Sequence, residues 1–266
     1  MSARSGTRGQ LEMGERALRF GVVAEAKSDA LRGCRLADRL FLKWIDWLKP
    51  EQLPALRSWV GLDQNPDRMF VDGYYLDIHD AKKLHQERRL PQRHGRFSGE
   101  VRAAIYAVEL LNRTEPPIEG ILYLRDGDTS GPSRLADAES ARDQCNRGDN
   151  MAIGIPNQCM DAWVVAGFEP SPDEQEIVNR ERKRLGFGPM DGSHRLSHKK
   201  SHPKSAKQVL ATLSCNDAER ISQCLEAPLE TLDARGQNNG YCKFTESIKA
   251  SLYKIISDAS SETSSN

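Results

Sequence analysis

The sequence has no net charge, no long apolar run and no closely paired cysteines, and each absence argues against a class of protein. Its 266 residues carry 38 Lys and Arg against 38 Asp and Glu, so the overall charge indicates no particular partner. No run approaches the roughly 20 apolar residues of a membrane-spanning helix. Residues 1–10 are polar and no signal-peptide core follows closely, so we expect a cytoplasmic protein with no membrane partner.

The six cysteines are scattered and include no Cys-x-x-Cys pair. This spacing argues against a zinc ribbon and a secreted disulfide scaffold, and predicts reduced thiols. A Gly-rich phosphate-binding loop is also missing from the sequence, which disfavours a nucleotide or small-phosphate binder.

The chain alternates short apolar runs with amphipathic helical segments. Strands are expected at residues 18–25, 69–76, 121–124 and 151–156. Helices are expected at residues 29–49, 98–111, 132–147 and 159–168, and residues 50–68 are expected to be irregular or short-helical. This order predicts an α/β fold with a parallel or mixed sheet flanked by helices.

The domain prediction rests on composition. A Pro-rich segment at residues 169–173 is the best boundary, and helical patterns follow it. The division is a flexible tail (1–16), an α/β domain (17–170), a smaller helical C-terminal region with a basic loop (171–257) and a second tail (258–266).

Acidic residues follow two of the expected strands. Asp126 and Asp128 flank Gly127 just after the strand at 121–124, and Glu25 ends the strand at 18–25. Ligands of open α/β sheets bind beyond the carboxyl ends of the strands, and residues i and i+2 of an extended chain point to one side. Three carboxylates there suit Mg²⁺ or Mn²⁺. The alternative for the Asp pair is an ordinary Asp-Gly turn.

At these residues the sequence resembles the Toprim family. That family has Glu-Gly-x-x-Asp after its first strand and Asp-x-Asp after a later one, and residues 25–29 and 126–131 match in kind, order and context. The resemblance covers residues 17–170; the sequence departs from the family in Ala26, where Gly is usual, and in the wide separation of the two motifs. It implies a Toprim-like sheet with Glu25, Asp126 and Asp128 as catalytic and metal-binding residues.

The resemblance implies two further ligands. Some defence-associated Toprim nucleases carry an acid beside a Trp after a later strand, and Asp161 near Trp163 matches that position as a metal ligand. The alternative, which we favour from the local pattern, places Asp161 on the solvated face of an amphipathic helix. Asp29 is a candidate supporting ligand.

Basic residues concentrate at residues 180–207, where nine Lys and Arg against two acids give a local charge of +7. This asymmetry favours a polyanion partner, although a basic surface loop is an equal alternative. The residues predicted to hold the nucleic-acid backbone are Arg195, Lys199, Lys200, Lys204 and Lys207. Three histidines recur in this segment without an acid or Cys to complete a zinc set, so no metal role is expected for them.

The leading hypothesis is therefore a Mg²⁺- or Mn²⁺-dependent nuclease acting on DNA or RNA. In an alternative role, Glu25 acts as general base instead of binding the metal. The resemblance implies an effector of bacterial anti-phage defence that a partner ATPase or sensor protein keeps silent. The second hypothesis is a catalytically silent Toprim-like subunit that binds or regulates within a multi-protein complex, which Ala26 supports. The sequence leaves open the choice between DNA and RNA and the oligomeric state.

Overall fold

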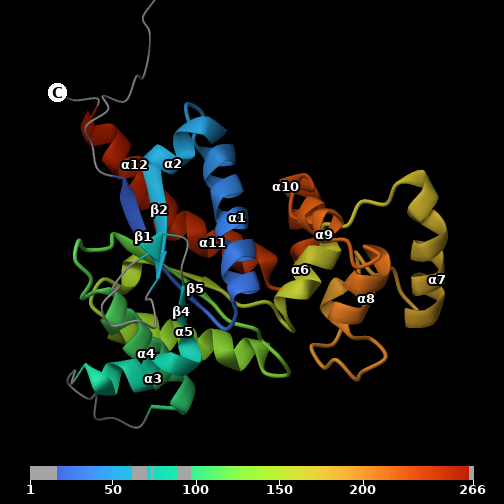
Figure 1. Cartoon of the computed structure of the whole chain (residues 1–266), viewed down its shortest axis with the longest axis horizontal. Coiled ribbons are helices and arrows are strands. Elements are labelled where there is room, and N and C mark those ends of the chain that lie inside the picture. Colours follow the sequence, from blue (N-terminus) through green and yellow to red (C-terminus); the bar gives the residue numbers. More distant parts are fainter. Residues whose placement is uncertain (1–16, 62–70, 73–74, 89–96, 264–266) are drawn as a thin grey trace, which may run out of the picture.

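The computed structural model describes residues 17–61, 71–72, 75–88 and 97–263, and confirms an α/β fold with a central sheet and a helical C-terminal region (Figure 1). The strands follow the order β3-β2-β1-β5-β6, and β4 pairs with β1 beyond the end of β2. Five strands run parallel, and β3 pairs antiparallel with β2. The strands are β1 (Leu18–Ala24), β2 (Arg57–Gly61), β3 (Val71–Asp72), β4 (Leu76–Asp77), β5 (Gly120–Leu124) and β6 (Met151–Gly154).

The central strands are apolar on both sides because helices cover both faces of the sheet. Phe20, Val22 and Leu122 point into one core with α1, α6, α11 and α12, whereas Val23 and Tyr123 point into the other with α3, α4 and α5. The helices are α1 (Lys27–Trp44), α2 (Leu53–Leu56), α3 (Ile78–Glu87), α4 (Gly99–Leu111), α5 (Gly131–Gln144), α6 (Met160–Ala166), α7 (Gln175–Leu185), α8 (Ala206–Leu213), α9 (Ala218–Cys224), α10 (Leu229–Gly236), α11 (Tyr241–Ala250) and α12 (Leu252–Thr263).

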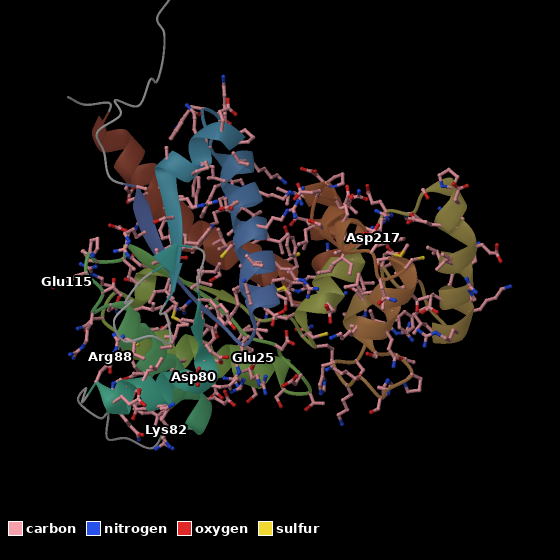
Figure 2. The ribbon with its side chains drawn as sticks, in the orientation of Figure 1. Glu25, Asp80, Lys82, Arg88, Glu115 and Asp217 are labelled. Carbon is pink, nitrogen blue, oxygen red and sulfur yellow. The ribbon has the colours of Figure 1, made fainter. Side chains whose placement is uncertain are left out.

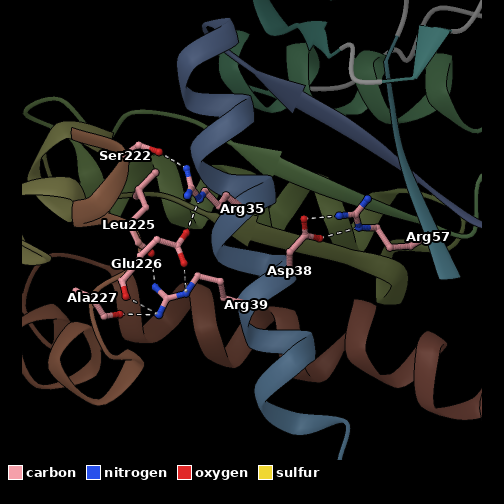
Figure 3. A network of polar contacts seen from close by, with 8 residues as sticks. All are labelled: Arg35, Asp38, Arg39, Arg57, Ser222, Leu225, Glu226 and Ala227. Carbon is pink, nitrogen blue, oxygen red and sulfur yellow. Dashed lines mark hydrogen bonds and ion pairs between the residues drawn. The ribbon is translucent and has the colours of Figure 1, made fainter. Parts of the chain in front are cut away.

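The C-terminal region has two parts. Helices α7 to α10 form a lobe beside α6, with α7 farthest from the sheet, and α11 and α12 return to the sheet against β6 and β5 (Figure 1). Arginines on α1 fasten the lobe: Arg35 pairs with Glu226 and donates to Ser222, and Arg39 donates to the carbonyl groups of Leu225 and Ala227 (Figure 3). The domain boundary near residue 170 stays a prediction, since both parts contribute to one buried core.

Several local expectations are confirmed. β1, β5 and β6 lie where their apolar runs predict strands, and Ser98 caps α4 by accepting a hydrogen bond from Val101 N at 3.1 Å. The structure differs from expectation at the C-terminus, where α12 continues to Thr263, into the segment expected to be a tail. Within the described ranges, no helix combines the length and the apolar character that a membrane crossing requires.

One expectation about the sheet is wrong. Residues 57–61 form β2, a parallel partner of β1, although an irregular or short-helical segment was expected there. The strand is short and begins with Arg57, whose guanidinium pairs with Asp38 of α1 (Figure 3). Its stability therefore depends on partners distant in the sequence, and Trp59 and Val60 are buried by that pairing.

Candidate functional site

The site lies at the carboxyl edge of the sheet, where β1, β5 and β6 end together. The parallel register pairs Val22 with Leu122 and Leu122 with Ala152, so the loops after the three strands meet at one edge. Glu25 lies where the chain passes from β1 to α1 (Figure 2). The sheet thus brings Glu25 to the same edge as the Asp126 loop, as its predicted position requires.

The Asp126 loop packs tightly against the loop that follows β6. Asp128 N donates to Gln158 O at 2.7 Å, and a side chain at Gly127 would clash with the carbonyl oxygen of Pro156. Asp128 itself has a left-handed backbone, with φ of 50°. Gly is needed at position 127 because the two loops approach each other backbone to backbone.

Asp126 is the electrostatic centre of the site. Its Oδ1 accepts a hydrogen bond from Met160 N, 2.8 Å away at the start of α6. Burial, together with the charges of Asp29, Glu25 and Asp128, raises the pKa of this carboxyl to about 7, although the hydrogen bond from Met160 opposes the shift. Three other carboxylates therefore lie within electrostatic reach of Asp126.

Two arginines neutralise part of this charge. Arg134 on α5 places Nη2 2.8 Å from Asp128 Oδ2 and Nη1 3.6 Å from Glu25 Oε1. Arg125 Nε lies 2.9 Å from the same Glu25 oxygen. Burial nevertheless raises the pKa of Glu25, which both arginines oppose. Arg134 thus links the two acidic motifs directly.

A second acidic pair adjoins the first across α1 and α6. Arg32 Nη1 lies 2.8 Å from Asp161 Oδ1 and 3.9 Å from Asp29 Oδ1. The side chain of Asp161 is 20% exposed and therefore half-buried. Burial, opposed by Arg32 and reinforced by Asp161, raises the pKa of Asp29. The predicted ligand and the supporting acid are thus held by one guanidinium.

The basic segment reaches the site through one histidine. His198 Nε2 lies 4.0 Å from Asp128 Oδ1, and its Nδ1 lies 3.4 Å from Gln158 Oε1. The three histidines of the segment fall in a 3₁₀ turn and a loop, not on one helical face. Sequence reasoning missed the approach of His198 because it depends on the fold. The position of Arg134 could have suggested its contact with the acids, because it lies in the first turn of the helix that follows the Asp126 loop.

The five predicted nucleic-acid contacts lie on this same segment. Arg195 ends a 3₁₀ turn, Lys207 belongs to α8, and the other three occupy the loop that a bridge between Ser197 and Ser205 closes. All five are exposed or half-buried. Three of them therefore share a loop with His198, whose Nε2 lies 4.0 Å from Asp128 Oδ1. A second run of basic residues, at 80–96, lies partly on α3 and partly outside the described residues.

The donor atoms of the acidic edge suit a hard divalent cation, because carboxylate oxygens are the ligands that Mg²⁺ and Mn²⁺ prefer. Burial is the main cause of the raised pKa of Asp126, and the repulsion from neighbouring acids that adds to it is the kind that a bound cation relieves. Within the described part of the chain, however, no three His, Cys, Asp or Glu side chains form a preassembled metal-binding group. An ion would compete with Arg134 for Asp128 and Glu25.

Comparison with protein-family models, with curated proteins and with solved structures found no match to this chain.

Proposed function

We propose that the protein is a metal-dependent phosphodiesterase that acts on nucleic acid. The observation that carries this proposal is the convergence of Glu25, Asp29 and Asp128 on Asp126 at the carboxyl edge of the sheet, where burial and the charges of these three acids raise the pKa of Asp126 to about 7. Pairs of acids whose burial shifts their pKa values are typical of catalytic sites. Structural ion pairs have the same effect, so the proposal needs a chemical test.

The roles follow from position. Asp126, Asp128 and Glu25 would hold Mg²⁺ or Mn²⁺, with Asp29 and Asp161 as supporting acids. A bound ion supplies a water of lowered pKa and stabilises the leaving oxygen of a phosphodiester. In the alternative role, Glu25 accepts the proton of the attacking water, which its raised pKa favours. Arg134 and Arg125, which contact Glu25, would bind and orient the phosphate.

The basic segment supports nucleic acid as the substrate. Its cations contact phosphates without reading sequence, and His198 brings the loop to Asp128. A role as an effector of anti-phage defence, held silent by a partner ATPase or sensor, remains part of the proposal and rests on the Toprim resemblance alone.

A second candidate is a catalytically silent Toprim-like subunit that binds or regulates within a complex. The observation that favours it is the pairing of the carboxylates: Arg134 contacts Asp128 and Glu25, and Arg32 contacts Asp161. Such pairing would stabilise the edge without a cation.

Cleavage of plasmid DNA and total tRNA, with Mn²⁺, Mg²⁺ or EDTA, separates the two candidates. We expect metal-dependent cleavage by the wild type and by Asp46→Asn, a control at an exposed position just after α1. Asp126→Asn keeps the acceptor for Met160 N but lacks the charge, so we expect it to lose cleavage. Full cleavage by this variant would contradict the assignment of the site.

A further inference from the structure

Only two acids accompany the nine basic residues at 180–207. The two acids of the segment are already engaged: Glu181 pairs with Arg184 on α7, and Asp191 lies 3.4 Å from Arg235 Nε. Among the described residues, no ion pair involves the other eight cations, which are Arg180, Arg182, Lys183, Arg195, Lys199, Lys200, Lys204 and Lys207. This positive charge is therefore uncompensated.

Two of these cations lie over the ring of Phe187. The ring is only 8% exposed, Arg195 Cζ lies 4.2 Å from its centroid, and Lys204 Nζ lies 5.3 Å from it. A cation over an aromatic face is attracted to it and loses side-chain freedom there. Because Arg195 itself is exposed, its guanidinium lies on the ring with N–H groups available to a ligand.

A hollow of about 620 Å³ borders Phe187. Its walls come from the last turns of α7 and the loop that follows, namely Asn179, Arg182, Lys183, Gly186, Phe187 and Gly188. The four α7-side positions are spaced i, i+3, i+4 and i+7, so they share one helical face. Gly186 ends the helix with φ of 77° and has open space above it. Basic residues also complement a helix C-terminus, but that role does not explain a hollow or a stacked arginine.

We propose that this Phe187 pocket binds phosphate groups of a nucleic-acid backbone. Arg182 and Lys183 contact the phosphates from α7, and Arg195 and Lys204 contact them from the platform of Phe187. The loop carrying Lys204 also carries His198, which lies 4.0 Å from Asp128 Oδ1. The pocket therefore anchors the strand at one end of a basic path whose other end is the acidic edge. The inference rests on the proposed function for its choice of nucleic acid as the anion.

The test is binding of a fluorescein-labelled DNA 20-mer, and of an RNA of the same sequence, by fluorescence anisotropy in EDTA. The variant Arg182→Glu/Lys183→Glu is compared with Lys243→Glu/Lys254→Glu, which makes the same charge change at exposed positions on α11 and α12. We expect the pocket variant to weaken binding at least tenfold and the control less than threefold. The slope of log affinity against log salt should fall by about 2 in the pocket variant.

Equal weakening by both variants would overturn the proposal, because it would indicate only the effect of net charge. Absence of binding by the wild type at 50 mM salt in EDTA would overturn it as well. Melting temperatures of both variants check the fold, and Arg182→Gln/Lys183→Gln repeats the comparison without charge reversal. A smaller loss of the same kind is expected for that variant, and no loss contradicts the proposal.

Two further arms identify the source of the phosphate and separate this inference from the proposed activity. Inorganic phosphate and ATP are added as competitors. Complete displacement of the labelled 20-mer by micromolar ATP would indicate a site for small anions and contradict the proposal that the pocket binds a nucleic-acid backbone. Asp126→Asn should bind the 20-mer in EDTA as the wild type does. If nuclease activity is absent but the pocket variant still loses binding, the pocket stands and the proposed reaction fails. If the pocket variant binds normally and cleaves at the wild-type rate, the proposed reaction stands and the pocket assignment fails.

Discussion

The charged side chains of the acidic edge are paired with opposite charges, whereas, in the part of the chain that the structure describes, most of the basic side chains of the lobe formed by α7 to α10 are not. At the edge, Arg134, Arg125 and Arg32 neutralise carboxylates that are partly buried between β1, β5 and α6. In the lobe, no ion pair among the described residues compensates the eight cations of residues 180–207 named above, and they are exposed or half-buried. Charges removed from water need partners, whereas solvated charges do not. Substitutions of charged residues at the acidic edge should therefore change the stability of the fold, whereas substitutions of the unpaired cations in the lobe should change only the binding of a ligand.

The largest expected effect on stability comes from the residue that supports the edge from behind. Trp163 of α6 is 1% exposed, its Nε1 donates to Asn239 O at 2.9 Å, and its ring lies 5.8 Å from Tyr241. We expect Trp163→Ala to lower the free energy of unfolding by about 3 to 5 kcal/mol. Urea unfolding followed by circular dichroism measures it, and a loss below 1 kcal/mol would contradict the packing described.

Asp126→Asn should stabilise the protein, and more so at high pH. The folded-state pKa of about 7 lies above the ordinary value of 3.8, so the folded protein holds this proton more tightly than the unfolded chain. The stabilisation that the proton gives is complete below pH 4 and lost as the pH rises through about 7. At pH 8 we expect the variant to be more stable by about 4 kcal/mol, since the two pKa values differ by about 3 and each pKa unit is worth about 1.4 kcal/mol. At pH 5 the gain should be smaller, and an equal gain at both pH values would contradict the shift.

The positions of the acids could be predicted from the sequence, but their partners could not. β1, β5 and β6 are apolar runs of low ambiguity, and an acid at the end of each of the first two fixes Glu25 and Asp126 at one edge of a parallel sheet. β2 escaped prediction because it depends on pairing with β1 and on Asp38. The contacts of Arg32 and His198 likewise join segments more than 60 residues apart, which no local pattern reveals.

Arg134→Gln should sharpen the comparison by leaving the edge acids without their shared cation. Glu25 and Asp128 would then repel each other, so we expect the variant to lose about 1 to 3 kcal/mol of stability in EDTA. Mn²⁺ should restore much of this loss and raise the melting temperature by more than it does in the wild type. Thermal unfolding with and without Mn²⁺ gives both values. A smaller Mn²⁺ effect in the variant would show that Arg134 does not compete with a cation.

The smallest stability effect is expected in the lobe. Lys199→Ala/Lys200→Ala removes two exposed cations that have no ion pair among the described residues, so the free energy of unfolding should change by less than about 0.5 kcal/mol. Binding of the DNA 20-mer should nevertheless weaken, with a salt slope smaller by about 2. Chemical unfolding and anisotropy on the same samples measure the two effects, and a stability loss without weaker binding would reverse the assignment of the lobe.

The most direct test of the central claim, that the acidic edge binds a divalent cation, is calorimetric titration of Mn²⁺ at pH 8 into the wild type, Asp126→Asn and Asp46→Asn. The site predicts saturable binding by the wild type and by Asp46→Asn, and an affinity at least tenfold weaker for Asp126→Asn. Equal binding by all three proteins, or no binding by the wild type, would contradict it.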